Sequence, residues 1–176
     1  MVGIKSLFLA AVSVTAATSK VIRRDAAQIQ TDLMDINGDV VALTNAVNNY
    51  SGGLFGALPV QNAEGNLEDS IEAATADAQA SAPVSSAETQ DIIDYINNTL
   101  EPNIDESITA IINKMSQFQS AGLAGTVRDD LTTLQSDTDD LGTALINKAA
   151  ADKKDAANAA LAAIDADFQR AVAAYN

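Results

Sequence analysis

Five stretches of the chain carry apolar residues at alternating three- and four-residue steps. Residues spaced in this way share one face of an α-helix, and that face must be buried against another surface. The first stretch predicts a helix over residues 26–50, with Asp25 and Gln28 as an N-terminal capping box and Ser51-Gly52-Gly53 as its stop. Its apolar positions are Ala26, Ile29, Leu33, Ile36, Val40, Leu43, Val47 and Tyr50.

The second stretch predicts a helix that begins at Leu54 or only after Pro59, and that ends before Ser81-Ala82-Pro83. The segment 54–58 is the most hydrophobic patch outside the N-terminal region, and glycines flank it. We therefore expect this segment to act as a lid or as a first contact with an apolar ligand. The apolar positions of the second helix are Val60, Ala63, Leu67, Ile71, Ala74 and Ala78.

The third stretch predicts a helix that opens with a capping box formed by Ser85 and Glu88. Its apolar spacing keeps phase across Pro102, which favours one long helix kinked at this proline over two separate helices. Its apolar positions are Ile92, Ile93, Ile96, Leu100, Ile104, Ile108, Ile111, Met115 and Phe118.

Two further helices follow, one after the turn at residues 121–125 and one that opens near Asp152. Strand-like alternation is absent from the sequence, and short links between long helices imply antiparallel neighbours. The sequence therefore predicts an all-α fold, an antiparallel five-helix bundle. The apolar positions of the last two helices are Val127, Leu131, Leu134, Thr138, Leu141 and Leu145, then Ala157, Leu161, Ile164, Phe168, Ala171 and Tyr175.

The N-terminal region has the pattern of a processing signal. Lys5 precedes an apolar run over residues 7–14 and small residues at 15–17, and the pair Arg23-Arg24 follows. We expect a signal peptide over residues 1–17, a short pro-segment over 18–24 ending in a dibasic site, and one helical domain over 25–176. The protein is then secreted, to the extracellular medium or cell wall, without a transmembrane segment. In that compartment the sequons at Asn49 and Asn97 are candidate N-glycosylation sites.

The amino-acid composition excludes several kinds of catalytic and metal site. The chain has no His and no Cys, which removes the usual nucleophile–base pairs and most transition-metal sites. We read the acidic residues Asp137, Asp139 and Asp140, and the pair Asp35 and Asp39, as solvated helix faces rather than a cation site. Removal of residues 1–24 takes the net charge from −14 to −18, which argues against nucleic acid as a partner. We expect no catalytic activity, no metal and no cofactor.

The aliphatic interior is the most informative feature. Only six aromatic residues follow residue 24, and many inward positions are alanine or medium-sized aliphatic residues. The sequence leaves two packings open: helices packed closely around alanine, or a central apolar cavity that would suit a fatty acyl chain. Thr138 is the polar residue of the fourth stripe, with Thr44 and Ser70 near other stripes. Thr138 either contacts a lipid head group or bonds to its own helix backbone.

These features give a set of candidate residues for contact with a fatty acid, another lipid or a hydrophobic solid surface. They share a place on the predicted inner stripes or in the segment 54–58. The set is Leu33, Ile36, Val40, Leu43, Val47, Leu54, Phe55, Leu58, Leu67, Ile71, Ile96, Leu100, Ile108, Leu134, Thr138, Leu141, Ile164 and Phe168.

Several short motifs, in order, carry a resemblance to a known family. They are Asp32-Leu33, Ala46-Val47, Gly52-Gly53-Leu54, Leu58-Pro59, Ser85-Ser86-Ala87-Glu88 and the run 134–145. Over residues 25–176 the chain resembles the fungal hydrophobic surface-binding protein A family, which includes antigenic cell-wall galactomannoproteins. The resemblance implies a secreted, non-enzymatic helical domain that captures lipid or adsorbs to hydrophobic surfaces and helps recruit polyester-degrading hydrolases such as cutinase. The alternative is a structural or antigenic cell-wall mannoprotein without a specific ligand.

Overall fold

The computed structural model describes residues 26–176, which are helical and contain no β-strand. The predicted signal peptide, the pro-segment and the cap at Asp25 lie outside the described residues. None of the described helices is both long and apolar enough to cross a membrane. The α-helices are α1 (Ala26–Asn49), α2 (Leu58–Ala80), α3 (Ser86–Tyr95), α4 (Glu101–Asn113), α5 (Met115–Ser120), α6 (Ala124–Lys148) and α7 (Lys154–Ala174). Two short 3-10 turns, η1 (Phe55–Ala57) and η3 (Ala151–Lys153), and a π-helical turn, η2 (Ile96–Leu100), complete the described secondary structure.

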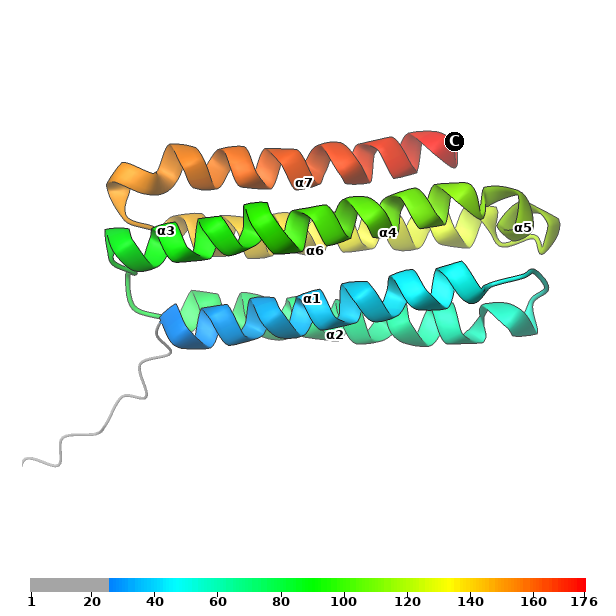
Figure 1. Cartoon of the computed structure of the whole chain (residues 1–176), viewed down its shortest axis with the longest axis horizontal. Coiled ribbons are helices and arrows are strands. Elements are labelled where there is room, and N and C mark those ends of the chain that lie inside the picture. Colours follow the sequence, from blue (N-terminus) through cyan, green and yellow to red (C-terminus); the bar gives the residue numbers. More distant parts are fainter. Residues whose placement is uncertain (1–25) are drawn as a thin grey trace, which may run out of the picture.

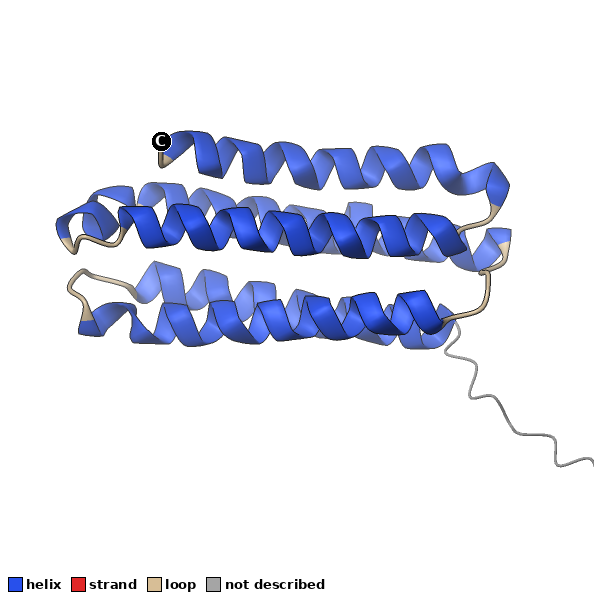
Figure 2. Ribbon diagram, turned by 180° about the vertical axis from the view of Figure 1, so that it is seen from behind, coloured by secondary structure: helices blue, strands red, loops and turns tan. Residues whose placement is uncertain are grey.

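The long helices lie along one common direction, and the chain reverses at each end of the molecule (Figure 1). Helices α1 and α2 lie side by side on one face, and α7 lies on the opposite face (Figures 1 and 2). Between these faces, α1 packs on α4 and α2 packs on α6, while α4 and α6 both contact α7. The apolar sides of all these helices therefore meet along one shared interior.

The predicted stripe of α1 forms the centre of this interior. All eight of its apolar positions are buried, and Val47 has no exposed surface. Full burial of a large aliphatic side chain contributes roughly 1.5–3 kcal/mol, so a stripe of this length fixes α1 against α2 and α4. The all-helical prediction is confirmed.

The predicted long third helix is divided more finely than the sequence indicated, so the count of five helices is not reproduced. The irregularity at Pro102 takes the form of the π-helical turn η2, where the backbone N–H of Glu101 donates to the carbonyl of Ile96. Proline has no N–H to donate, and the wider turn accommodates that loss without ending the helix. A true break comes later, at Lys114, so Met115 and Phe118 belong to the separate helix α5.

Local signals place the other boundaries. Helix α2 begins between the two predicted starts, after η1, and Pro59 lies in its first turn, where a missing N–H is tolerated. The capping box before α3 is confirmed: the Ser85 N–H donates to the Glu88 carboxylate at 3.0 Å, and the Ser85 side chain accepts from the Glu88 N–H. At the other end of the bundle, the rings of Tyr50 and Phe118 stack with centroids 4.5 Å apart, which joins the end of α1 to α5.

Candidate functional site

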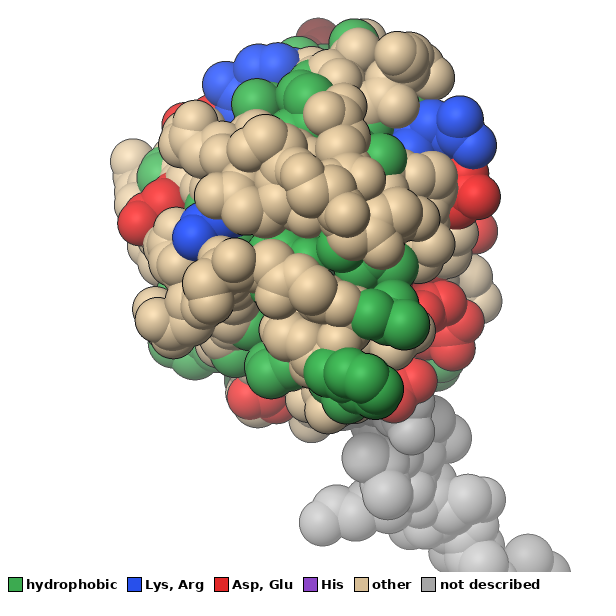
Figure 3. All heavy atoms as spheres, turned by 90° about the vertical axis from the view of Figure 1, so that its right-hand side faces the viewer, with side chains coloured by type: hydrophobic (Ala, Val, Ile, Leu, Met, Phe, Trp, Pro, Cys, Tyr) green, Lys and Arg blue, Asp and Glu red, His purple; other side chains and the backbone are tan. Residues whose placement is uncertain are grey.

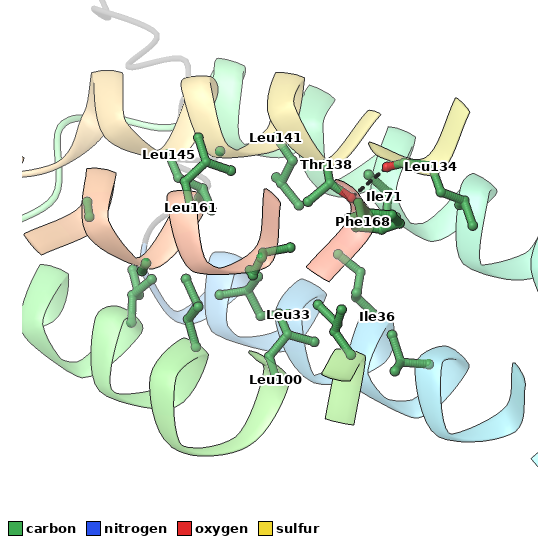
Figure 4. Close-up of a pocket in the computed structure, with 18 of the residues that line it drawn as sticks. Leu33, Ile36, Ile71, Leu100, Leu134, Thr138, Leu141, Leu145, Leu161 and Phe168 are labelled. Atoms are coloured by element: carbon green, nitrogen blue, oxygen red, sulfur yellow. Dashed lines mark hydrogen bonds between the residues drawn. The ribbon is translucent and has the colours of Figure 1, made fainter. Parts of the chain in front are cut away.

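An apolar cavity of about 100 Å³ lies inside the bundle, which we call the central cavity. Thirty residues line it, from α1, α2, α3, η2, α4, α6 and α7 and from the loops before α3 and after α6. On α1 the lining runs from Ile29 to Leu43, about 21 Å at 1.5 Å per residue. Figure 4 shows the labelled side chains of Leu33, Leu100 and Leu141 converging from three of these elements. The cavity is therefore an elongated aliphatic space along the bundle.

Three hydroxyl groups interrupt the apolar lining of the central cavity. Thr138 donates to the Leu134 carbonyl at 2.7 Å, so its hydroxyl bonds to its own helix backbone, one of the two roles predicted for it (Figure 4). Thr89 likewise donates to the Ser85 carbonyl at 2.8 Å. The Ser107 side chain is different, because its oxygen is buried and has no hydrogen-bond partner. Ser107 is thus the lining hydroxyl with a free donor, and the helical stripe pattern gave no sign of it.

A second cavity of about 360 Å³ lies at the end of the bundle where α1 turns into α2, and we call it the end cavity. Its walls are mainly apolar and include Leu54, Phe55 and Leu58. Four residues line both cavities and separate one from the other: Leu43, Ile111, Leu131 and Leu134. The two spaces are therefore neighbours with a wall of aliphatic side chains between them.

The segment 54–58 covers one side of the end cavity and is itself exposed. Leu54, Phe55 and Leu58 keep 62%, 84% and 51% of their surface accessible. Figure 3, which views this end of the molecule, shows hydrophobic side chains gathered there beside acidic ones. The chain reaches the segment through Gly52 and Gly53, whose φ angles of 114° and 80° lie in the left-handed region that favours glycine. Leu54, Phe55 and Leu58 therefore form an exposed apolar surface at this end of the molecule, which we call the apolar tip.

Two carboxyl groups line the end cavity, Glu64 of α2 and Asp130 of α6. Burial, followed by repulsion from Asp130 and Glu68, raises the pKa of Glu64 to about 7. Burial is also the main cause of the raised pKa of Asp130, with repulsion from Asp129 and Glu68 adding to it. The charged lining of the end cavity is therefore acidic only.

The structure brings most of the predicted contact residues together. Leu54, Phe55 and Leu58 line the end cavity, and Leu43 and Leu134 line both cavities. Val47 lines neither, because it is fully enclosed by neighbouring side chains. The remaining predicted residues line the central cavity: Leu33, Ile36, Val40, Leu67, Ile71, Ile96, Leu100, Ile108, Thr138, Leu141, Ile164 and Phe168.

The other polar candidates lie away from both cavities. Thr44 donates to the Val40 carbonyl at 2.8 Å, and Ser70 donates to the Asp39 carboxylate at 2.6 Å. The predicted glycosylation sites are exposed, Asn49 at the end of α1 and Asn97 in η2.

The acidic face of α6 is only partly solvated at Asp139, whose side chain is half-buried. Its Oδ1 atom and that of Asp165 on α7 are buried without a donor. Burial, followed by the proximity of the Asp165 and Asp140 carboxyls, raises the pKa of Asp139 to about 6. Asp137 also carries a buried oxygen without a partner, since the side chain lies partly beneath its neighbours.

The fold and the cavities define a class of protein: a small helical bundle with an apolar cavity between its helices. The chain belongs to the hydrophobic surface binding protein A family, whose model matches residues 26–147. No curated protein matches the chain significantly.

Solved structures share the fold over nearly the same length. The crystal structure of Afmp4p in complex with palmitic acid is 39% identical, covers 86% of this chain and 100% of that one, and has a TM-score of 0.83. Ligand binding domain 2 of Penicillium marneffei MP1 protein, complexed with multiple arachidonic acids, is 21% identical, covers 88% and 97%, and has a TM-score of 0.81. Domain 1 of the same protein, complexed with arachidonic acids, is 14% identical with a TM-score of 0.80, covering 86% and 99%.

Proposed function

We propose that this protein binds a fatty acid or a related long-chain lipid in the central cavity and acts without catalysis. The observation that carries the proposal is the elongated aliphatic lining with one unpartnered hydroxyl, Ser107. Each methylene that leaves water for such a space contributes roughly 0.8 kcal/mol, and a lone hydroxyl suits one polar atom of a head group. The family membership and the likeness to Afmp4p, crystallised with palmitic acid, support the same reading.

The cavity volumes bear on how such a ligand is held. Small-molecule sites usually measure roughly 300–1,000 Å³, so the central cavity at about 100 Å³ is small and the end cavity at about 360 Å³ falls within the range. A full acyl chain therefore requires lining side chains to move, or extends past the wall shared by the two cavities. The wall consists of four aliphatic side chains, each with alternative staggered rotamers, so a change of rotamer there would join the two cavities.

A cavity-filling variant tests the proposal. Ala157→Leu on α7 adds methyl groups to a residue that lines the central cavity, whereas Ala159→Leu adds them on an exposed position of the same helix. After lipid extraction and refolding, native mass spectrometry and calorimetry with palmitic acid should show one-to-one binding to the wild type and to A159L. We expect at least a tenfold loss of affinity for A157L. Absence of palmitate binding by the wild type would instead favour a structural wall protein with no specific ligand.

We further propose adsorption to hydrophobic solids through the apolar tip, because Leu54, Phe55 and Leu58 form the exposed apolar group of this end. Phe55→Ser should reduce adsorption of the purified protein to polyester beads. Met34→Ser is the matched control, because Met34 is 59% exposed and lies on α1 away from the tip. Equal adsorption of both variants and the wild type would remove the tip from the proposal.

Recruitment of a cutinase-like hydrolase and secretion to the medium or wall complete the proposal. The basic and apolar pattern before residue 18 supports secretion. Expression of the full chain in a fungal host, followed by N-terminal sequencing of the secreted protein, tests the processing sites. Co-adsorption of the protein and a cutinase on polyester beads tests recruitment, which fails if the hydrolase adsorbs equally well alone.

A further inference from the structure

The central cavity offers no charged group to a ligand. Its thirty lining residues come from every long helix, and none of them is ionisable at neutral pH. A carboxylate moved from water into such surroundings loses its hydration and gains no opposite charge in return. The hydroxyl of Ser107 would supply a single hydrogen bond, which suits a neutral oxygen better than a full negative charge.

Four of the six positive side chains among the described residues have partners outside the cavities. The chain has ten Lys and Arg, of which four precede residue 26 and six remain. Lys114 and Lys148 each donate to two backbone carbonyl oxygens, while Arg128 and Arg170 pair with aspartate side chains. Neither cavity is lined by any of the six: Lys114, Arg128, Lys148, Lys153, Lys154 and Arg170.

The end cavity also disfavours a negatively charged head group. Glu64 faces it from α2 and Asp130 from α6, with Glu68 and Asp129 close enough to repel them. Above about pH 7, where Glu64 is ionised, a fatty acid carboxylate placed there would meet like charge, because no lining side chain is basic. A protonated acid, an alcohol or an ester would escape this repulsion.

We infer that the bound ligand is an acyl lipid with an uncharged head group, so that a fatty acid binds as the protonated acid. This inference rests on the proposed function and specifies its ligand. It follows from the charge of the lining: an aliphatic chamber with one free hydroxyl, beside an end cavity whose charged groups are acidic. Long-chain alcohols and esters are then ligands in their own right, and their binding is independent of pH.

Two ligands of equal chain length test the inference, decanoic acid and 1-decanol. The free acid titrates near the pKa of a glutamate, about 4.3, so its neutral fraction falls roughly tenfold per pH unit above that value. Calorimetry between about pH 5 and about pH 8 should show the apparent Kd of decanoic acid rising by roughly tenfold per unit. The Kd of decanol should stay constant, which controls for any change in the protein itself.

The possible results distinguish failure of this inference from failure of the proposed lipid binding. If decanoic acid binds equally well at both ends of the pH range, the carboxylate is accepted and the inference is overturned while the lipid site stands. If neither ligand binds at any pH, the proposed function fails and the inference fails with it. The double variant E64Q/D130N should keep the pH slope, since the titrating proton is the ligand's own. Loss of the slope in that variant would overturn the inference, because the end cavity's carboxyls would then be its source.

Discussion

At Gly142, helix α6 comes close to the Leu161 side chain of α7 beside the central cavity. A Cβ atom at this position would lie 2.6 Å from Leu161 Cδ1 and 2.8 Å from Cδ2, closer than real Cβ contacts come. Both residues line the cavity, and Figure 4 shows Leu161 beside Leu145 of α6. Gly142→Ala therefore pushes the flexible end of Leu161 aside, and the cavity is the space available to receive it.

Two opposing effects set the change in the free energy of unfolding of G142A. Alanine in place of glycine inside a helix stabilises it by about 1 kcal/mol, while overpacking of a filled site costs about 1–3 kcal/mol. We expect G142A to lower the free energy of unfolding by about 0–2 kcal/mol. Gly38→Ala is the control, because Gly38 lies within α1 and a Cβ there meets nothing within 4 Å. That variant should be more stable than wild type by about 1 kcal/mol.

Urea denaturation of four proteins isolates the contact: wild type, G142A, Leu161→Ala and the double variant. In the L161A background the clash is gone, so G142A should become stabilising, and the two substitutions should couple by about 1–3 kcal/mol. G142A should also bind palmitate more weakly, because the displaced Leu161 side chain occupies the cavity. Stabilisation of G142A equal to that of G38A, with additive double-variant energies, would refute the close approach of α6 and α7.

Three further outcomes follow from the structure. The raised folded-state pKa of Asp139, about 6, means that its contribution to stability is lost as pH rises from the unfolded value near 3.8 through about 6. Asp139→Asn should therefore be more stable than wild type at about pH 8 and nearly equal to it at about pH 4, by thermal unfolding; a wild-type advantage at the higher pH would contradict this. Ser85→Ala removes the side-chain half of the capping box and should cost about 1 kcal/mol in urea denaturation, whereas Ser136→Ala, at an exposed position within α6, should cost less. Palmitic acid at about one hundred times its Kd should raise the free energy of unfolding by about 2.7 kcal/mol, and an unchanged Tm would count against binding.

The sequence by itself determined the local structure. The three- and four-residue spacing of apolar positions fixed where α1, α2, α6 and α7 run, because helix periodicity is set within a few residues along the chain. The same holds for the cap at Ser85 and Glu88 and for the disturbance at Pro102, since both depend on neighbouring backbone groups. Most predicted contact residues line a cavity for the same reason: the buried stripe of each helix is the side that faces the interior.

Only the tertiary structure decided what the stripes enclose. Periodicity places side chains on a face but carries no distance between helices, so a closed core and a cavity give the same pattern. Packing alone brings Leu161 against Gly142, divides the central cavity from the end cavity, and leaves Ser107 without a partner. It also sets Asp139 of α6 beside Asp165 of α7, whereas the helical pattern assigned Asp139 to a solvated face. The choice between close packing and a lipid-sized space depends on contacts between side chains of different helices. Those contacts cannot be read from the order of residues along the chain.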